Sequence, residues 1–140
     1  MRIVLFGSSD FALPLLEALH KSNHELVAVY TQPPSISGRG LRLKYGRLGK
    51  RAQDLCLNVF HPDVVNDDQV LDHFSNLSVD VAIVASYGQI LSTNLLSLPK
   101  FGFLNLHPSL LPHSFSLKAP LPILQYLDYL SMRRQCKLLY

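Results

Sequence analysis

Apolar and polar positions alternate along the chain in a way that predicts strands and helices in turn. Short apolar runs bounded by turn residues indicate buried strands, and apolar positions repeating every three to four residues indicate helices. The expected strands cover residues 2–6, 25–30, 59–60, 79–85 and 102–106. The expected helices cover residues 11–21, 47–57, 67–77 and 92–98.

The first strand, helix and second strand form a βαβ unit, which implies parallel pairing. Gly7 provides the turn after the first strand, but a full Gly-x-Gly-x-x-Gly sequence is missing, so we interpret it as a tight strand-to-helix turn. Ser9 or Asp10 is expected to cap the helix, and Pro14 fits only in its first turn. Asp67 and Asp68 are expected in the first turn of the third helix, where the helix dipole favours negative charge.

The pattern as a whole predicts an α/β fold: a Rossmann-like open, mostly parallel sheet with flanking helices. The 140 residues suffice for one domain, and 48% hydrophobic against 16% charged residues predicts a buried core. No apolar stretch has the length of a membrane span, and the first apolar run is too short for a signal peptide. Cys56 and Cys136 are eighty positions apart in the sequence, which is the spacing of neither a disulfide framework nor a cysteine metal site. We therefore expect a cytoplasmic protein without a metal.

Periodicity is lost between residues 31 and 46, where two prolines and three glycines predict a long loop with a functional role. The net charge is only +3, yet no acidic residue occurs between Glu25 and Asp54. Six of the thirteen basic residues fall there: Arg39, Arg42, Lys44, Arg47, Lys50 and Arg51. This unbalanced positive charge predicts a surface that attracts polyanions.

Candidate chemistry lies at the carboxyl ends of the last two strands, where open α/β sheets bind ligands. Tyr87 and Gly88 follow one strand, and Asn105 and His107 end the other. An asparagine amide can donate to a developing oxyanion, and a neutral histidine can transfer a proton. An equally simple interpretation is a polar strand end whose histidine is merely hydrogen-bonded.

Four segments occur in the order and approximate spacing of methionyl-tRNA formyltransferases: GSSDFALPLLEAL, TQPPSISGRG, ASYGQIL and NLHPSLLP. Over residues 1–112 the chain resembles this family, which implies a formyltransferase domain. The resemblance implies transfer of a formyl group from 10-formyltetrahydrofolate to methionyl initiator tRNA in translation initiation. It also implies a monomer that binds folate and tRNA, with no membrane partner.

The resemblance also assigns residues. Asn105 and His107 match the catalytic pair. The folate-contacting positions are Tyr87, Gly88, Gln89, Ile90, Leu91, Ser109, Leu110, Leu111 and Pro112. The tRNA-contacting positions are Arg39, Arg42, Lys44 and Arg47.

After Pro112 the resemblance decays, and residues 113–140 form a divergent tail that we expect from a frameshift or an early stop. The family's catalytic aspartate and its C-terminal tRNA-binding domain are therefore expected to be missing, and Asp128 does not match the aspartate in context. We therefore expect a fragment of a methionyl-tRNA formyltransferase whose catalytic activity is impaired. Two alternatives stay open: a folate formyltransferase acting on glycinamide ribonucleotide or a sugar nucleotide, and a non-catalytic Rossmann-like pseudoenzyme.

Overall fold

The computed structural model describes residues 1–37 and 42–106, and residues 38–41 and 107–140 lie outside the described part. Its centre is a five-stranded sheet in which all neighbouring strands are parallel, in the order β5-β2-β1-β6-β7. These strands are β1 (Arg2–Gly7), β2 (Glu25–Tyr30), β5 (Val59–Phe60), β6 (Val81–Ala85) and β7 (Phe103–Leu106). The predicted α/β fold with a parallel sheet is confirmed.

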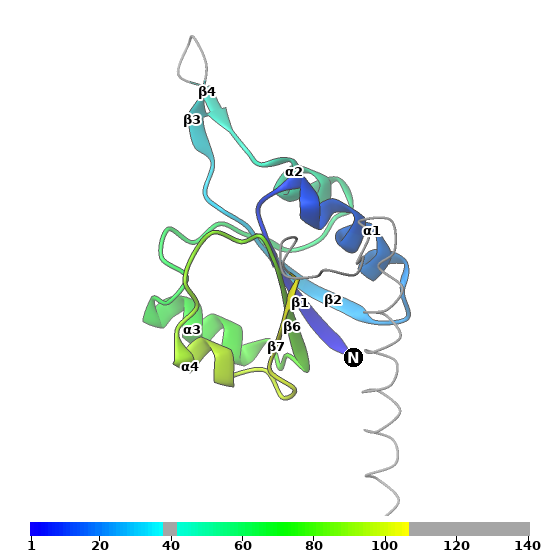
Figure 1. Cartoon of the computed structure of the whole chain (residues 1–140), viewed down its shortest axis with the longest axis vertical. Helices are drawn as coiled ribbons and strands as arrows, with labels where there is room; N and C mark the ends of the chain where they lie inside the picture. Colours follow the sequence, from blue (N-terminus) through cyan, green and yellow to red (C-terminus); the bar gives the residue numbers. More distant parts are fainter. Residues whose placement is uncertain (38–41, 107–140) are drawn as a thin grey trace, which may run out of the picture.

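Helices cover both faces of this sheet (Figure 1). They are the 3-10 turn η1 (Asp10–Ala12), α1 (Leu13–Lys21), α2 (Arg47–Asp54), α3 (Asp68–Asn76) and α4 (Thr93–Ser97). Side chains of α1 and α2 pack on one face, and those of α3 and α4 pack on the other. Within the described ranges, no helix is long and apolar enough to cross a bilayer.

The central strand β1 contributes to both halves of the core because successive side chains of a strand point to opposite faces. Ile3 and Leu5 pack with the cluster under α1 and α2. Val4 and Phe6 pack with the cluster under α3 and α4. All four are fully buried, as expected for a middle strand of a sheet covered on both sides.

The starts of two helices differ from the sequence expectation. Helix α1 is preceded by the turn η1, its N-cap is Ala12, and neither Ser9 nor Asp10 caps it with a side chain, so that prediction was wrong. Pro14 does lie in the first turn of α1. Asp67 is the N-cap of α3 and accepts a hydrogen bond from the Gln69 amide at 3.1 Å, so only Asp68 occupies the first turn.

Helix α2 is shorter than the sequence predicted and ends at Asp54 instead of residue 57. Cys56 has a φ of 57°, which a continuing helix does not allow. The Leu57 amide returns to the carbonyl of Ala52 at 3.0 Å, closing the helix end. The chain can then enter β5 beside β2.

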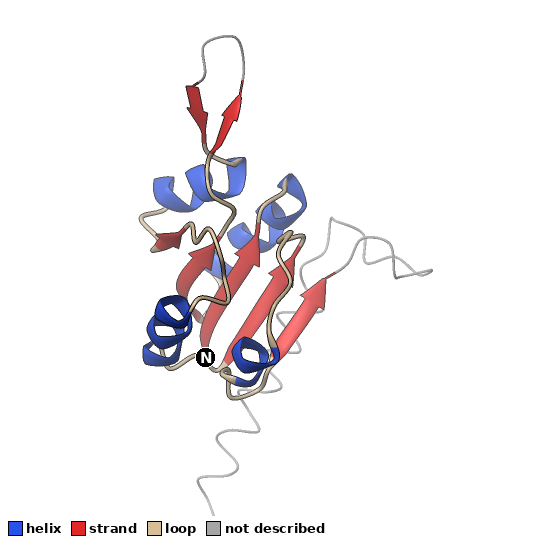
Figure 2. Ribbon diagram, turned by 90° about the vertical axis from the view of Figure 1, so that its left-hand side faces the viewer, coloured by secondary structure: helices blue, strands red, loops and turns tan. Residues whose placement is uncertain are grey.

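The segment 31–46, expected to be a loop without strands, contains a two-stranded antiparallel hairpin. Its strands are β3 (Ser35–Ser37) and β4 (Arg42–Lys44), with Ser35 opposite Lys44. The hairpin projects from the end of the molecule toward which the longer strands of the sheet point (Figure 2). Cross-strand hydrogen bonds form here although each strand has only three residues and one apolar position, Ile36 or Leu43, which is too short an alternation to identify a strand.

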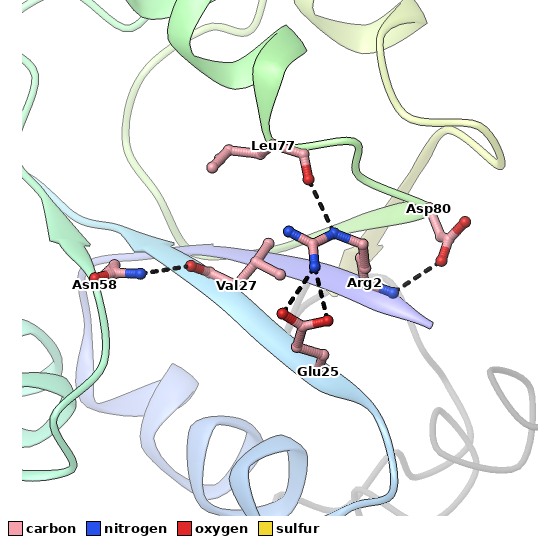
Figure 3. A network of polar contacts seen from close by, with 6 residues as sticks. All are labelled: Arg2, Glu25, Val27, Asn58, Leu77 and Asp80. Carbon is pink, nitrogen blue, oxygen red and sulfur yellow. Dashed lines mark hydrogen bonds and ion pairs between the residues drawn. The ribbon is translucent and has the colours of Figure 1, made fainter.

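Polar contacts close the opposite, amino-terminal edge of the sheet (Figure 3). The Arg2 guanidinium donates to both carboxylate oxygens of Glu25, at 2.8 and 2.7 Å, and to the Leu77 carbonyl at 3.1 Å. The buried carboxylate of Asp80 accepts from the Arg2 amide at 2.8 Å. These groups serve the fold, and the candidate chemistry lies at the other edge.

Candidate functional site

The carboxyl edge of the sheet brings together the two segments that the sequence singled out. In the β6–β7 pairing, Asn105 lies opposite Val84, one residue before the end of β6 at Ala85. The expectation that Asn105 and Tyr87 reach the same edge is therefore confirmed. His107 lies outside the described residues, as do the expected folate contacts Ser109, Leu110, Leu111 and Pro112.

The Asn105 side chain is exposed, while its neighbours Leu104 and Leu106 are half-buried and pack against the α1–α2 side of the core. Phe103, two residues earlier, packs on the α3–α4 side. Because side chains alternate along a strand, Asn105 belongs to the same face as Phe103. An exposed carboxamide at a strand end is free to donate to a ligand.

The segment that follows β6, residues 86–92, is here called the 86–92 loop. It is held by the ends of two neighbouring strands. The Ser8 hydroxyl contacts the carbonyl of Ser86 at 2.6 Å and that of Tyr87 at 3.0 Å, and the Ser8 amide donates to the Ser86 carbonyl at 3.1 Å. The Gln32 amide group donates to the Tyr87 carbonyl at 2.8 Å. The start of the loop is thus fixed to β1 and β2.

The backbone of Tyr87 lies at this edge of the sheet, but its side chain points into the core. Its side chain is 2% exposed and its ring meets Phe6 edge-on, with centroids 5.3 Å apart. Burial raises the pKa of the Tyr87 phenol, with a smaller contribution from Tyr30. The Tyr87 ring therefore anchors the 86–92 loop, so any contact of Tyr87 with a ligand would have to come from its backbone.

Gln89 also has an internal role. Its side-chain oxygen accepts from the Val65 amide at 2.9 Å, and its nitrogen donates to the Pro62 carbonyl at 3.2 Å and to the Gln32 side-chain oxygen at 3.4 Å. Leu91 is half-buried against the α3–α4 side of the core. Of the five positions assigned in this loop, only Gly88 and Ile90 have exposed side-chain positions.

Gly88 and Ile90 give the loop an open outer surface. Gly88 has a φ of +90°, a conformation that favours glycine, and Ile90 is 89% exposed. Among the described residues, no hydrogen bond is made by the backbone amides of Gly88, Gln89 and Ile90. Fixed, unpaired amides beside an exposed apolar side chain suit a flat heterocycle that has hydrogen-bond acceptors at its rim.

A cavity of about 440 Å³ lies beside the ends of β1 and β2, and its wall includes residues that the sequence did not single out. Its lining consists of Ser8, Thr31, Gln32, Pro33, Ser35, Tyr45, Gly46 and Arg47. The Thr31 hydroxyl is buried and has no hydrogen-bond partner in the described part of the chain. The available sequence signal was position, since Ser8 directly follows β1 and Thr31 and Gln32 are the first two residues after β2.

The basic segment is partly neutralised by acidic residues from elsewhere in the chain. Arg47 pairs with Asp10, and Arg51 pairs with Glu17. The expectation of a wholly unbalanced positive stretch was therefore wrong for these two residues. Arg42 and Lys44 lie in β4 of the projecting hairpin, and Arg39 lies outside the described residues.

Comparison with known proteins gives the family. The profile of the formyl transferase family matches residues 1–116, so the chain belongs to the formyl transferase family. A methionyl-tRNA formyltransferase of Rhizorhabdus wittichii is 46% identical over 112 residues, which is 80% of this chain and 36% of that protein. One of Alkaliphilus oremlandii is 42% identical over 112 residues, again 80% and 36% of the two chains. The chain spans little more than a third of the length of these relatives.

Solved structures agree on the fold. Phosphoribosylglycinamide formyltransferase of Bacillus halodurans superposes with a TM-score of 0.58 at 19% identity, covering 80% of this chain and 58% of that one. The enzyme of the same name from Brucella melitensis gives 0.56 at 25% identity, covering 83% and 61%. The arrangement of strands and helices described above is thus that of formyltransferases.

Proposed function

We propose that this chain carries the formyl-transfer site of an enzyme that uses 10-formyltetrahydrofolate to formylate methionyl initiator tRNA in translation initiation. The observation that carries the proposal is the 42–46% identity to curated relatives named methionyl-tRNA formyltransferase. The solved glycinamide ribonucleotide enzymes are 18–25% identical and support the fold. A cytoplasmic location and a monomeric state belong to the same proposal.

In the proposed reaction, the methionyl amine nitrogen forms a bond to the formyl carbon, and the carbonyl electron pair moves to oxygen. Collapse of this tetrahedral intermediate breaks the bond from the formyl carbon to N10 of the folate, and a proton from the amine ends on N10. The exposed carboxamide of Asn105 is suited to donate to the oxyanion. His107 is proposed to move the proton.

The folate donor is proposed to bind along the 86–92 loop. Support comes from the unpaired amides of Gly88 to Ile90, from the exposed Ile90 side chain and from the anchoring of the loop by Ser8 and Gln32. A pterin ring has both acceptors and donors at its edge and an apolar face, which matches this surface. Ser109, Leu110, Leu111 and Pro112 are proposed to complete the donor site.

The tRNA is proposed to contact the projecting hairpin. Arg42 and Lys44 belong to β4, on an element that stands away from the sheet (Figure 2), and Arg39, which lies outside the described residues, is proposed to act with them. Arg47 contributes from the base of the hairpin, although its pairing with Asp10 reduces its local charge. Contacts of basic residues with phosphates give salt-dependent affinity without sequence specificity.

The direct test is formylation of methionyl initiator tRNA by the purified chain with 10-formyltetrahydrofolate, measured as formyl-methionine released after deacylation. Glycinamide ribonucleotide and an amino sugar nucleotide serve as rival acceptors. Formylation of the tRNA and neither rival supports the proposal. Formylation of a rival alone replaces it with the alternative enzyme.

Binding of the donor is tested separately with 5-formyltetrahydrofolate, a stable relative of the donor. A ligand that binds only the folded state at a hundred times its Kd stabilises that state by about 2.7 kcal/mol. The expected result is a rise of the unfolding temperature that saturates with ligand. No stabilisation and no transfer would favour the non-catalytic pseudoenzyme.

A further inference from the structure

Asn66, to which the sequence assigned no role, connects to the 86–92 loop at two points. It lies between β5 and α3, and its side chain is half-buried. Its Nδ2 donates to the Ile90 carbonyl at 2.8 Å, and its Oδ1 accepts from the Ser92 amide at 2.8 Å. One carboxamide therefore holds the backbone on both sides of Leu91.

The backbone that carries Asn66 is itself fixed to the same loop. The preceding amide, that of Val65, donates to the Gln89 side chain, and the Val65 side chain is fully buried. Gln89 also contacts the Pro62 carbonyl. Each segment thus sends one amide side chain to the backbone of the other, and the Gln89 contacts hold the backbone next to Asn66 in place.

The bonds of Asn66 fix the direction of the peptide units beside the open surface of the loop. Ile90 has its carbonyl oriented by Asn66, while its side chain is 89% exposed and its amide is unpaired among the described residues. Backbone groups that already have their binding orientation lose less entropy when a ligand is bound. Without Asn66 the 86–92 loop would have the same sequence, but the orientation of its Ile90 peptide unit would no longer be fixed.

We propose that Asn66 is a positioning residue for the formyl donor, a role that rests on the proposed function. It orients the backbone of Ile90 so that the unpaired amides of the 86–92 loop meet the rim of a pterin ring. Asn66 acts through the loop and does not touch the reacting atoms. Donor affinity, more than overall stability, depends on it.

The experiment compares Asn66→Ala, Asn66→Asp and Asn94→Ala. Asn94 is a matched control in α4, because its side chain is exposed and makes no hydrogen bond to another described residue. Each variant is titrated calorimetrically with 5-formyltetrahydrofolate at pH 7.5, well below its unfolding temperature. The expected loss of affinity is about tenfold for Asn66→Ala, the effect of one or two ordinary hydrogen bonds, and none for Asn94→Ala.

Asn66→Asp separates positioning from a general weakening of the structure. The aspartate can still accept from the Ser92 amide but turns a negative oxygen toward the Ile90 carbonyl. We expect slow hydrogen exchange of the Ser92 amide to survive in Asn66→Asp and to be lost in Asn66→Ala. Donor affinity should fall in both.

Wild-type affinity in both Asn66 variants would overturn the positioning role and leave the proposed donor site intact. A loss of affinity in Asn66→Ala with none in Asn66→Asp would also overturn it, because Ile90 would then not matter. If the wild-type chain gives no heat with 5-formyltetrahydrofolate, both the donor site and this role of Asn66 are wrong.

Discussion

Gly7 lies so close to Leu48 that a Cβ placed on it would be 2.8 Å from Cδ2 of the leucine. The same Cβ would lie 2.9 Å from the Ala12 Cβ and 3.1 Å from the Ala85 carbonyl oxygen. Strand β1, helix α2 and strand β6 therefore meet at this position without room for a methyl group. The glycine turn after the first strand is required by this close approach.

We predict that Gly7→Ala destabilises the fold by about 1–3 kcal/mol through overpacking at this junction. Gly46→Ala is the matched control, because its Cβ would meet only the Ser8 carbonyl oxygen at 3.5 Å and the Thr31 hydroxyl at 4.0 Å. Its backbone, with φ −60° and ψ 150°, suits alanine. Urea denaturation of both variants measures the difference, and equal midpoints would contradict the close packing.

The hydroxyl of Tyr30 is buried without a hydrogen-bond partner in the described part of the chain, and its ring stacks on Phe6 at 4.7 Å. Tyr30→Phe keeps the ring and removes the unsatisfied group. We predict a gain in the free energy of unfolding of about 1 kcal/mol. A loss of stability measured by urea denaturation would mean that the hydroxyl has a partner.

Burial raises the pKa of Tyr30 to about 12, above the ordinary value of about 10. The fold thus favours the neutral phenol. The free energy of unfolding is unaffected by Tyr30 ionisation below pH 10 and falls as the pH rises toward 12, because the unfolded state loses its proton first. We predict that the free energy of unfolding falls less steeply with pH in this alkaline range for Tyr30→Phe than for the wild type. Circular dichroism at fixed urea concentration measures the difference.

Glu17 and Arg51 join α1 to α2 through an ion pair, and the hydrogen bond from Arg51 lowers the pKa of the Glu17 carboxyl. A lowered pKa means stability that is present above the ordinary range for glutamate and lost as the pH falls through the folded value. Glu17→Gln should therefore be less stable than the wild type at pH 7. The difference should shrink below about pH 4.

Solvent and salt limit the effect of this pair, since the side chains of Glu17 and Arg51 are 32% and 43% exposed. High salt at pH 7 should also reduce the difference in stability between Glu17→Gln and the wild type. Asp63→Asn, at an exposed position, is the control. A pH-independent difference between Glu17→Gln and the wild type would contradict the ion-pair origin.

Asn105 is exposed at the end of β7, so Asn105→Ala should change the free energy of unfolding by no more than about 0.5 kcal/mol. If its amide stabilises the oxyanion, formyl transfer to methionyl-tRNA should fall by about 10²–10³-fold. Asn76→Ala, at the exposed end of α3, is the control for removal of an asparagine. A wild-type single-turnover rate in Asn105→Ala would exclude the catalytic role.

The strands and their parallel pairing were readable from the chain because their signals are local. Apolar runs such as 2–6 and 25–30 are short enough to be read as buried strands. The connection between them passes through one helix, which makes the two strands parallel. The hairpin at 35–44 was missed because each of its strands is only three residues long and has a single apolar residue, Ile36 or Leu43. Its hydrogen bonds are made by the backbone, which every residue possesses.

The sequence alone determined the local βαβ unit, the edge of the sheet at which Asn105 and the 86–92 loop lie, and the segments that resemble a formyltransferase. Only the tertiary structure decided which way each side chain of that edge points. It turned Tyr87 into the core, paired Arg47 with Asp10, and brought Asn66 to Ile90 across 24 positions. Such contacts depend on the packing of distant segments, and the identity of a residue does not encode the neighbour that packing gives it.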